Sequence, residues 1–174
     1  MVPPVELVRA TRLIPAPAAA VFELLATPAQ HAVIDGSGTV RDAQPGTPRR
    51  LSAGSTFGMQ MHWGAPYKIR NQVVEFEEGR LIAWRHFGGH VWRYRLTPVT
   101  DTTTEVTEEF DPAGSRAPIV LKLMGASRRN QRSIEETLAR LEAWARARRA
   151  SGASGQAPAD RDRLRWSSPG WPYG

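Results

Sequence analysis

The sequence predicts an α+β domain in which an antiparallel sheet packs against a long helix near the C-terminus. Two observations favour this fold class. Hydrophobic residues alternate with a period of two over most of residues 55–110, as in strands with one buried face. Residues 117–149 instead carry hydrophobic residues at helical spacing. The chain of 174 residues, 41% of them hydrophobic, is the size of one domain with a substantial core.

The first third of the chain predicts one strand, two short helices and a second strand. Pro15 and Pro17 end the first strand, and Thr27 and Pro28 are suited to the N-cap and first position of the second helix. A loop rich in proline and glycine follows the second strand. The expected elements are Val5–Ile14, Ala18–Ala26, Pro28 to about Ile34, Val40–Ala43 and the loop Gln44–Gly54.

The middle of the chain predicts strands joined by short turns. Glycine occurs in each of the three turns that separate the first four strands. The expected strands are Ser55–Trp63, Tyr67–Phe76, Arg80–His86, His90–Thr97 and Thr103–Phe110.

The helical stretch Ala117–Arg149 is hydrophobic at both ends and small or polar between them. Its second half has a stripe formed by Ile134, Leu138, Leu141, Trp144 and Ala145. One helix, straight or bent, would leave space beneath its centre near Ser127, and that space predicts a cavity. Two helices with a break are the alternative, since Gly125 is unfavourable inside a helix and Ser133 and Glu136 have the capping-box spacing that could start a second one.

The strand register follows from the turn Phe87-Gly88-Gly89. A three-residue loop with a glycine in the left-handed conformation pairs His86 with His90, Trp84 with Trp92 and Ile82 with Tyr94. The next strand then pairs Leu96 with Val106, Tyr94 with Glu108 and Trp92 with Phe110. A two-residue Gly88-Gly89 turn would split the aromatic residues between the two faces, so the first register is preferred.

This register predicts an inner wall of aromatic residues and methionines facing the helix. Methionine adapts its shape and packs well on aromatic rings, which suits a flat or flexible hydrophobic ligand. An ordinary filled core is the alternative. The candidate ligand-binding residues are Phe57, Met59, Met61, Trp63, Trp84, His86, Trp92, Tyr94, Glu108 and Phe110 on the sheet, with Met124, Ser127, Ile134 and Leu138 on the helix.

Three polar residues, His86, Tyr94 and Glu108, fall on the same inner face. A buried carboxyl group must be paired, hydrogen-bonded or neutral. Glu108 therefore has three possible roles: a satisfied polar pair, a hydrogen bond to a ligand, or acid–base catalysis with a raised pKa. His62, on the outer face, and His90, at a hairpin end, are weaker candidates.

Composition excludes several kinds of chemistry. The chain has no cysteine, which excludes disulfides, thiolate catalysis and cysteine-based metal sites. The four histidines lack metal-ligand spacing, so we expect neither a metal nor a cofactor. No hydrophobic run approaches the roughly 20 residues of a membrane span, and the N-terminus has no signal-peptide pattern. We therefore expect a cytoplasmic protein.

The chain is basic, with 23 lysines and arginines and a net charge of +6. Many arginines lie on the long helix, where such a run usually forms a solvated face. No phosphate loop, helix-turn-helix or RNP signature accompanies them, so nucleic-acid binding is not expected. Residues 1–150 form the expected domain, and residues 151–174, rich in glycine, serine, proline and arginine, form an expected flexible tail.

The order of the elements resembles that of a known superfamily. The stretches Pro15-Ala16-Pro17-Ala18-Ala19-Ala20-Val21-Phe22, Leu81-Ile82-Ala83-Trp84, Trp92–Pro98 and Thr104–Glu108 are similar to those of START/Bet v 1-like (SRPBCC) proteins of the polyketide cyclase/dehydrase branch. The resemblance covers about residues 5–149. It implies a helix-grip fold, in which a curved antiparallel sheet wraps the C-terminal helix and encloses a hydrophobic ligand cavity. Because the superfamily includes aromatases, cyclases and lipid carriers, the resemblance implies a ligand-enclosing fold and does not specify an activity.

Three functional hypotheses follow. The first is binding of a small hydrophobic molecule, such as a lipid, polyketide-like or isoprenoid compound. The second is a cyclase or dehydratase that uses Glu108 and His86 with Tyr94 as a donor. The third is a protein interaction module that uses the arginine-rich helix face and the tail. The oligomeric state stays open between monomer and homodimer.

Overall fold

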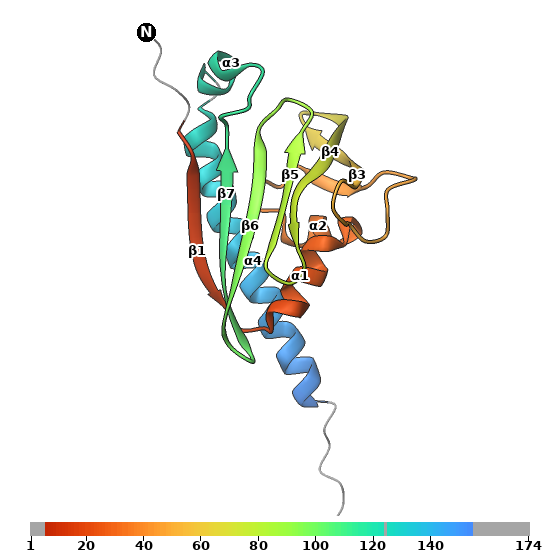
Figure 1. Cartoon of the computed structure of the whole chain (residues 1–174), viewed down its shortest axis with the longest axis vertical. Helices are drawn as coiled ribbons and strands as arrows, with labels where there is room; N and C mark the ends of the chain where they lie inside the picture. Colours follow the sequence, from red (N-terminus) through yellow and green to blue (C-terminus); the bar gives the residue numbers. More distant parts are fainter. Residues whose placement is uncertain (1–5, 124, 155–174) are drawn as a thin grey trace, which may run out of the picture.

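The computed structural model describes residues 6–123 and 125–154. Its strands form one antiparallel sheet in the order β1-β7-β6-β5-β4-β3-β2. Figure 1 shows this sheet curving around α4, with α1 and α2 beside α4 on the same side of the sheet. The strands are β1 Val8–Ile14, β2 Val40–Ala43, β3 Thr56–Trp63, β4 Ala65–Glu77, β5 Leu81–His86, β6 Val91–Thr100 and β7 Thr103–Asp111. This is the helix-grip fold expected from the sequence.

The short helices after β1 lie where the sequence places them. They are α1 Ala18–Ala26, the 3₁₀ turn η1 Pro28–Gln30 and α2 His31–Ile34. Thr27 precedes η1 but does not cap it with its side chain, because its hydroxyl donates to the Glu23 carbonyl at 2.8 Å instead. Buried residues of α1 and α2, including Phe22, Leu25 and Ile34, join the core between the helices and the sheet.

The strand register confirms the three-residue turn. Trp84 pairs with Trp92 and Ile82 with Tyr94 across β5 and β6. On the next strand Tyr94 pairs with Glu108. Gly89 has a φ of 95°, a left-handed conformation that favours glycine, and His86 N–H donates to the His90 carbonyl. The turn therefore places the aromatic residues of both strands on one face.

The expectation of a single C-terminal helix is wrong, because the helix is interrupted at Gly125. Helix α3 spans Pro118–Leu123 and α4 spans Ala126–Ser154. Gly125 lies between them with a φ of 63°, a conformation that an α-helix cannot contain. The break thus comes before Ala126, well before the possible capping box at Ser133. Helix α4 continues four residues past the expected end of the domain at residue 150; residues 155–174 of the expected tail lie outside the described residues.

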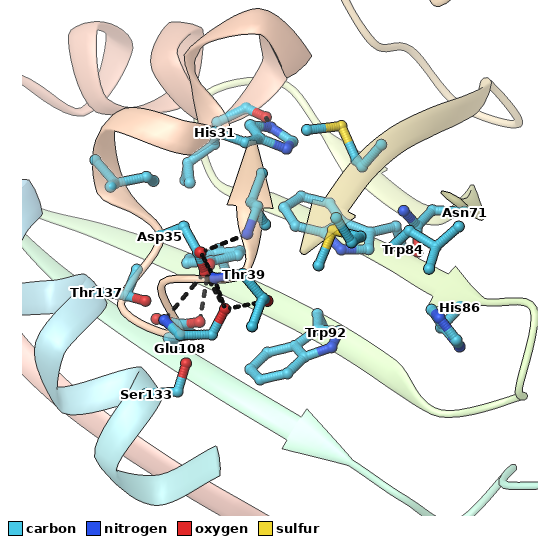
Figure 2. A pocket seen from close by; sticks show the side chains of 18 of the residues that line it. His31, Asp35, Thr39, Asn71, Trp84, His86, Trp92, Glu108, Ser133 and Thr137 are labelled. Atoms are coloured by element: carbon cyan, nitrogen blue, oxygen red, sulfur yellow. Dashed lines mark hydrogen bonds between the residues drawn. The ribbon is translucent and has the colours of Figure 1, made fainter. Parts of the chain in front are cut away.

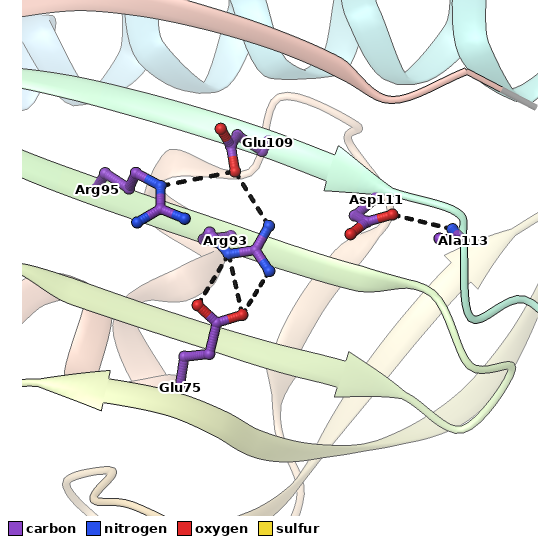
Figure 3. Close-up of polar contacts among 6 residues, drawn as sticks. All are labelled: Glu75, Arg93, Arg95, Glu109, Asp111 and Ala113. Carbon is purple, nitrogen blue, oxygen red and sulfur yellow. Dashed lines mark hydrogen bonds and ion pairs between the residues drawn. The ribbon is translucent and has the colours of Figure 1, made fainter.

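The outer face of the sheet carries a network of ion pairs that is separate from the core (Figure 3). Arg93 donates to both carboxylate oxygens of Glu75 and, at 3.1 Å, to Glu109. Arg95 lies 3.8 Å from the same Glu109 oxygen. The hydrogen bonds from Arg93 lower the pKa of Glu75. Because these partners lie on three strands, β4, β6 and β7, the network ties the sheet together on the side away from α4.

Candidate functional site

A pocket of about 160 Å³ lies between the inner face of the sheet, the segment from α2 to β2, and one edge of α4 (Figure 2). Its walls are largely aromatic and aliphatic, with polar groups at the ends. The lining residues are Leu25, His31, Ile34, Asp35, Ser37, Thr39, Val40, Phe57, Met59, Met61, Ile69, Asn71, Trp84, His86, Trp92, Tyr94, Glu108, Ser133 and Thr137. A cavity of this size accommodates about one six-membered ring.

The structure brings together most of the sheet residues that the sequence proposed for this wall. Trp84 forms its centre, since its ring packs 5.1 Å from His31, 5.6 Å from Phe57 and 5.4 Å from Tyr94 between centroids. Ligand binding by these residues stays a prediction. The sheet residues that line the pocket as expected are Phe57, Met59, Met61, Trp84, His86, Trp92, Tyr94 and Glu108.

Two of the expected sheet residues do not line the pocket. Trp63 is 61% exposed at the end of β3, where the Arg129 guanidinium lies 5.4 Å from its ring centroid. Phe110 is buried, but its ring packs 5.0 Å from Trp92 and 5.1 Å from His90, behind the pocket wall. The alternation along β3 therefore predicted the face of the sheet that carries Trp63. It did not show that the end of this strand extends beyond the elements that cover the rest of that face.

The expected helix residues also lie elsewhere. Helix α4 packs along β1 and β7, so its hydrophobic stripe, including Ile134 and Leu138, is buried in that contact and does not line the pocket. Ser127 is half-buried and lines no part of the pocket. Met124 lies outside the described residues. Ser133 and Thr137, one turn apart, supply the helix edge that faces the pocket instead.

Glu108 is the buried carboxyl group of the pocket. It is 2% exposed, and the Tyr94 hydroxyl donates to its Oε1 at 2.8 Å. Its Oε2 has no hydrogen-bond partner among the described residues. Burial raises the pKa of Glu108 well above its ordinary value, and the nearby charge of Asp35 adds to the rise, while the Tyr94 hydrogen bond opposes it. When Glu108 is protonated, its Oε2 hydroxyl can donate a hydrogen bond to an acceptor in the pocket, because Oε1 already accepts one from Tyr94.

His31 stacks on the Trp84 ring, with the two ring planes 19° apart. Its Nε2 lies 2.8 Å from the Leu25 carbonyl oxygen, and because a carbonyl only accepts, Nε2 carries the proton. Burial lowers the pKa of His31, so the ring is neutral and its Nδ1 keeps a lone pair. The sequence analysis did not single out this residue.

Asp35 organises the loop that closes the pocket on the α2 side. Its two carboxylate oxygens accept hydrogen bonds from the N–H groups of Ser37, Thr39 and Val40 and from the Ser37 hydroxyl, at 2.6 to 3.1 Å. Because Asp35 is saturated with local donors, its role is to hold the loop. The loop then reaches α4, where Gly36 N–H donates to the Thr137 hydroxyl at 3.0 Å.

Replacing Gly36 by alanine is expected to destabilise the fold by about 1–3 kcal/mol. A Cβ at this position would lie 2.2 Å from the Ser133 carbonyl oxygen and 2.4 Å from the Thr137 nitrogen, both of them backbone atoms of α4. Urea unfolding of Gly36→Ala measures the loss. Gly38→Ala gives the cost of backbone strain without a steric clash, because a Cβ there meets nothing within 4 Å but the φ of 66° favours glycine. Equal stability of Gly36→Ala and the wild type would contradict the close approach of this loop to α4.

His86 is at the other end of the pocket from Glu108, beyond Trp92 (Figure 2). Its ring stacks 4.4 Å from that of His90, and burial lowers the pKa of each to about 4. The His86–His90 pair and the Tyr94–Glu108 pair are four residues apart along β6, which is roughly 13 Å of strand. His86 and Glu108 are therefore too far apart to act on the same ligand atom, although each contacts the pocket.

Several pocket residues were missed by sequence reasoning. Ser133 and Thr137 have helical spacing, but as small polar residues beside a hydrophobic stripe they resemble any polar flank. The run Asp35-Gly-Ser-Gly-Thr39 is a strong local signal for a tight loop, yet nothing in it indicates what the loop covers. Asn71 is 4% exposed and its amide makes no hydrogen bond to a described residue, and alternation along β4 would have placed it on the inner face.

Neither a metal centre nor a membrane-spanning helix is found in the part of the chain that the structure describes. No group of three histidine, aspartate or glutamate side chains there is arranged to hold a metal ion. No helix there combines the length and the hydrophobicity needed to cross a membrane.

Comparison with solved structures agrees with the fold. The crystal structure of Ms6760 from Mycobacterium smegmatis has a TM-score of 0.57 at 18% identity, covering 79% of this chain and 91% of that one. The di-domain ARO/CYC protein BexL of the BE-7585A biosynthetic pathway has a TM-score of 0.55 at 18% identity, covering 79% and 45%. At these identities the likeness shows the fold alone.

Sequence relatives are closer. The uncharacterized protein Rv0088 of Mycobacterium tuberculosis is 38% identical over 139 residues, which is 76% of this chain and 62% of that protein. The chain thus spans less than two thirds of that relative's length. The family model described as polyketide cyclase / dehydrase and lipid transport matches residues 6–146, which confirms the resemblance inferred from the sequence. The chain therefore belongs to the polyketide cyclase/dehydrase and lipid transport family.

Proposed function

We propose that the protein binds a small, flat, mostly hydrophobic molecule that carries a hydrogen-bond acceptor such as a carbonyl oxygen. One observation carries the proposal: Glu108 is buried in the pocket with an unpartnered Oε2. Leaving a buried polar group unpaired costs about 1–3 kcal/mol, so a bound acceptor would recover that free energy. The volume of about 160 Å³ and the faces of Trp84 and Trp92 favour one aromatic or cyclic ring beside this acid.

Acetophenone and ethylbenzene form a suitable pair of probes, because they have similar shapes and only the ketone accepts a hydrogen bond. We expect acetophenone to bind the wild type at pH 6 more tightly than ethylbenzene, by roughly tenfold, measured by tryptophan fluorescence titration. Glu108→Gln should keep this preference, since its amide still donates. Glu108→Leu should lose it, because leucine cannot donate.

Glu105→Leu is the matched control, since Glu105 is an exposed acid on the same strand. It should bind both probes as the wild type does. If the wild type binds neither probe, or binds both equally, then recognition of an acceptor by Glu108 is wrong.

Acid catalysis is the second candidate, favoured by the same raised pKa of Glu108 beside a pocket. In that case Glu108 would donate its proton to a substrate oxygen, as a dehydration or a ring closure requires. The glutamine variant separates the two candidates, because an amide keeps the hydrogen bond but cannot supply a proton. For a confirmed substrate, unchanged turnover by Glu108→Gln would exclude the catalytic role.

A further inference from the structure

A second hollow adjoins the pocket at the start of α4. It has a volume of about 570 Å³ and is open to solvent. One side is formed by the loop residues Gly36 and Ser37, and the other by arginines of the first turns of α4. These arginines, Arg128, Arg129 and Arg132, lie at three- and four-residue spacing, so they share one face of the helix.

The three arginines make no ion pair with any residue that the structure describes. Elsewhere on the same helix, Arg140 pairs with Glu136 and Arg146 with Glu142. Arg129 contacts the Trp63 ring by a cation–π interaction, which leaves its charge uncompensated. We call Arg128, Arg129 and Arg132 the arginine cluster.

Glu136 is the acidic residue that lines this hollow. Its Oε1 already accepts a hydrogen bond from Arg140 at 3.0 Å, on the next turn of the helix. It is therefore engaged away from the arginine cluster, and the hollow keeps a net positive charge.

The hollow and the pocket share two residues, Ser37 and Ser133. Arg129 is one helical turn before Ser133, which is about 6 Å along the axis of α4. The two hollows therefore adjoin each other, and a molecule that fills both has its ring beside Glu108 and its other end at the arginine cluster. A ligand larger than one ring has to extend beyond the pocket, and the adjoining hollow is the space into which it would extend.

We propose that the arginine cluster binds an acidic group, a carboxylate or a phosphate, of the same molecule whose ring occupies the pocket. The inference rests on the proposed function for the hydrophobic part of the ligand. Arginine guanidinium groups bind both kinds of anion through paired, charge-assisted hydrogen bonds. The ligand is then an acid with a hydrophobic ring, oriented with its charge toward the start of α4.

Three probes with the same ring and linker test this assignment: 4-phenylbutanoate, 4-phenylbutyl phosphate and the uncharged 4-phenylbutanamide. Tryptophan fluorescence titrations compare their affinities for the wild-type protein. We expect at least one anion to bind about tenfold or more tightly than the amide. A preference for the carboxylate would indicate a free carboxylic acid, and a preference for the phosphate would indicate a phosphorylated ligand.

The variant Arg128→Gln/Arg132→Gln should abolish the preference for the anion and leave the affinity for the amide unchanged. The matched control is Arg70→Gln/Arg85→Gln, which removes the same charge from exposed positions on β4 and β5. It should keep the preference, which separates local binding from the effect of net charge.

The possible failures are distinct. If the amide binds but the anions bind no more tightly, or if both double variants behave alike, the arginine cluster is a solvated or partner-facing surface and this inference is overturned. If no probe binds, the proposed function itself fails, and the inference fails with it.

Discussion

Replacing Trp84 by alanine is expected to lower the free energy of unfolding by about 3–5 kcal/mol. The Trp84 side chain is 9% exposed and is in ring contact with His31, Phe57 and Tyr94, which come from three other elements. Its removal leaves a space that these rings cannot fill without moving apart. Urea unfolding at pH 7 measures the loss, and added indole should recover part of it by occupying the vacated space.

Trp63→Ala is the control for this experiment. The sequence places Trp63 on the same face as the inner wall, but its side chain is 61% exposed. Its removal should change the free energy of unfolding by less than about 1 kcal/mol, because the ring is mostly exposed and its cation–π contact with Arg129 is weak at such a site. Equal losses for the two tryptophan variants would mean that Trp84 does not hold the wall together.

The contrast between these two tryptophans shows how far sequence reasoning reaches. Period two assigns a residue to a face of the sheet, and the Phe87–Gly89 turn fixes the register that aligns Trp84, Trp92 and Tyr94. Neither pattern says where along a strand the covering layer ends. That limit is set by the placement of α4, which depends on contacts far apart in the sequence.

The prediction of which helix residues line the pocket was wrong for a related reason. A hydrophobic stripe predicts the side of a helix that is buried, and Ile134 and Leu138 are indeed buried. They pack where α4 lies along β1 and β7, whereas the pocket uses Ser133 and Thr137 on the neighbouring edge. Ser133 and Thr137 face the pocket because the loop held by Asp35 packs against this edge of α4. The sequence of that loop does not reveal that α4 is the element it contacts.

Glu108 was predictable as a buried acid because Tyr94 pairs with it in the expected register. The effect of Glu108 on the pH dependence of the fold's stability can also be predicted. The pKa of Glu108 is raised in the folded protein, so above about pH 4.5 the unfolded chain loses a proton that the folded chain keeps. Stability should therefore fall as the pH rises, by up to about 1.4 kcal/mol per pH unit, until the pH passes the folded pKa.

Three histidines, one buried and two partly buried, oppose this trend at lower pH. The pKa values of His31, His86 and His90 are lowered, so each contributes stability that is lost as the pH falls below 6.5. Above about pH 7.5 these side chains are largely neutral in both states. The pKa of Tyr94 is raised above its ordinary value of 10, so Tyr94 does not titrate between pH 7.5 and 8.5. That window isolates Glu108.

Glu108→Gln should abolish this pH dependence while keeping the hydrogen bond from Tyr94. The variant and the wild type should have similar stability near pH 4.5, and the variant should become the more stable protein as the pH rises toward 8.5. Urea unfolding at several pH values, with Glu105→Gln as an exposed-acid control, measures the difference. Parallel curves for Glu108→Gln and the wild type would mean that Glu108 is ionised in the folded protein. It would then have no proton to donate to a ligand, and the binding and catalytic proposals would both lose their basis.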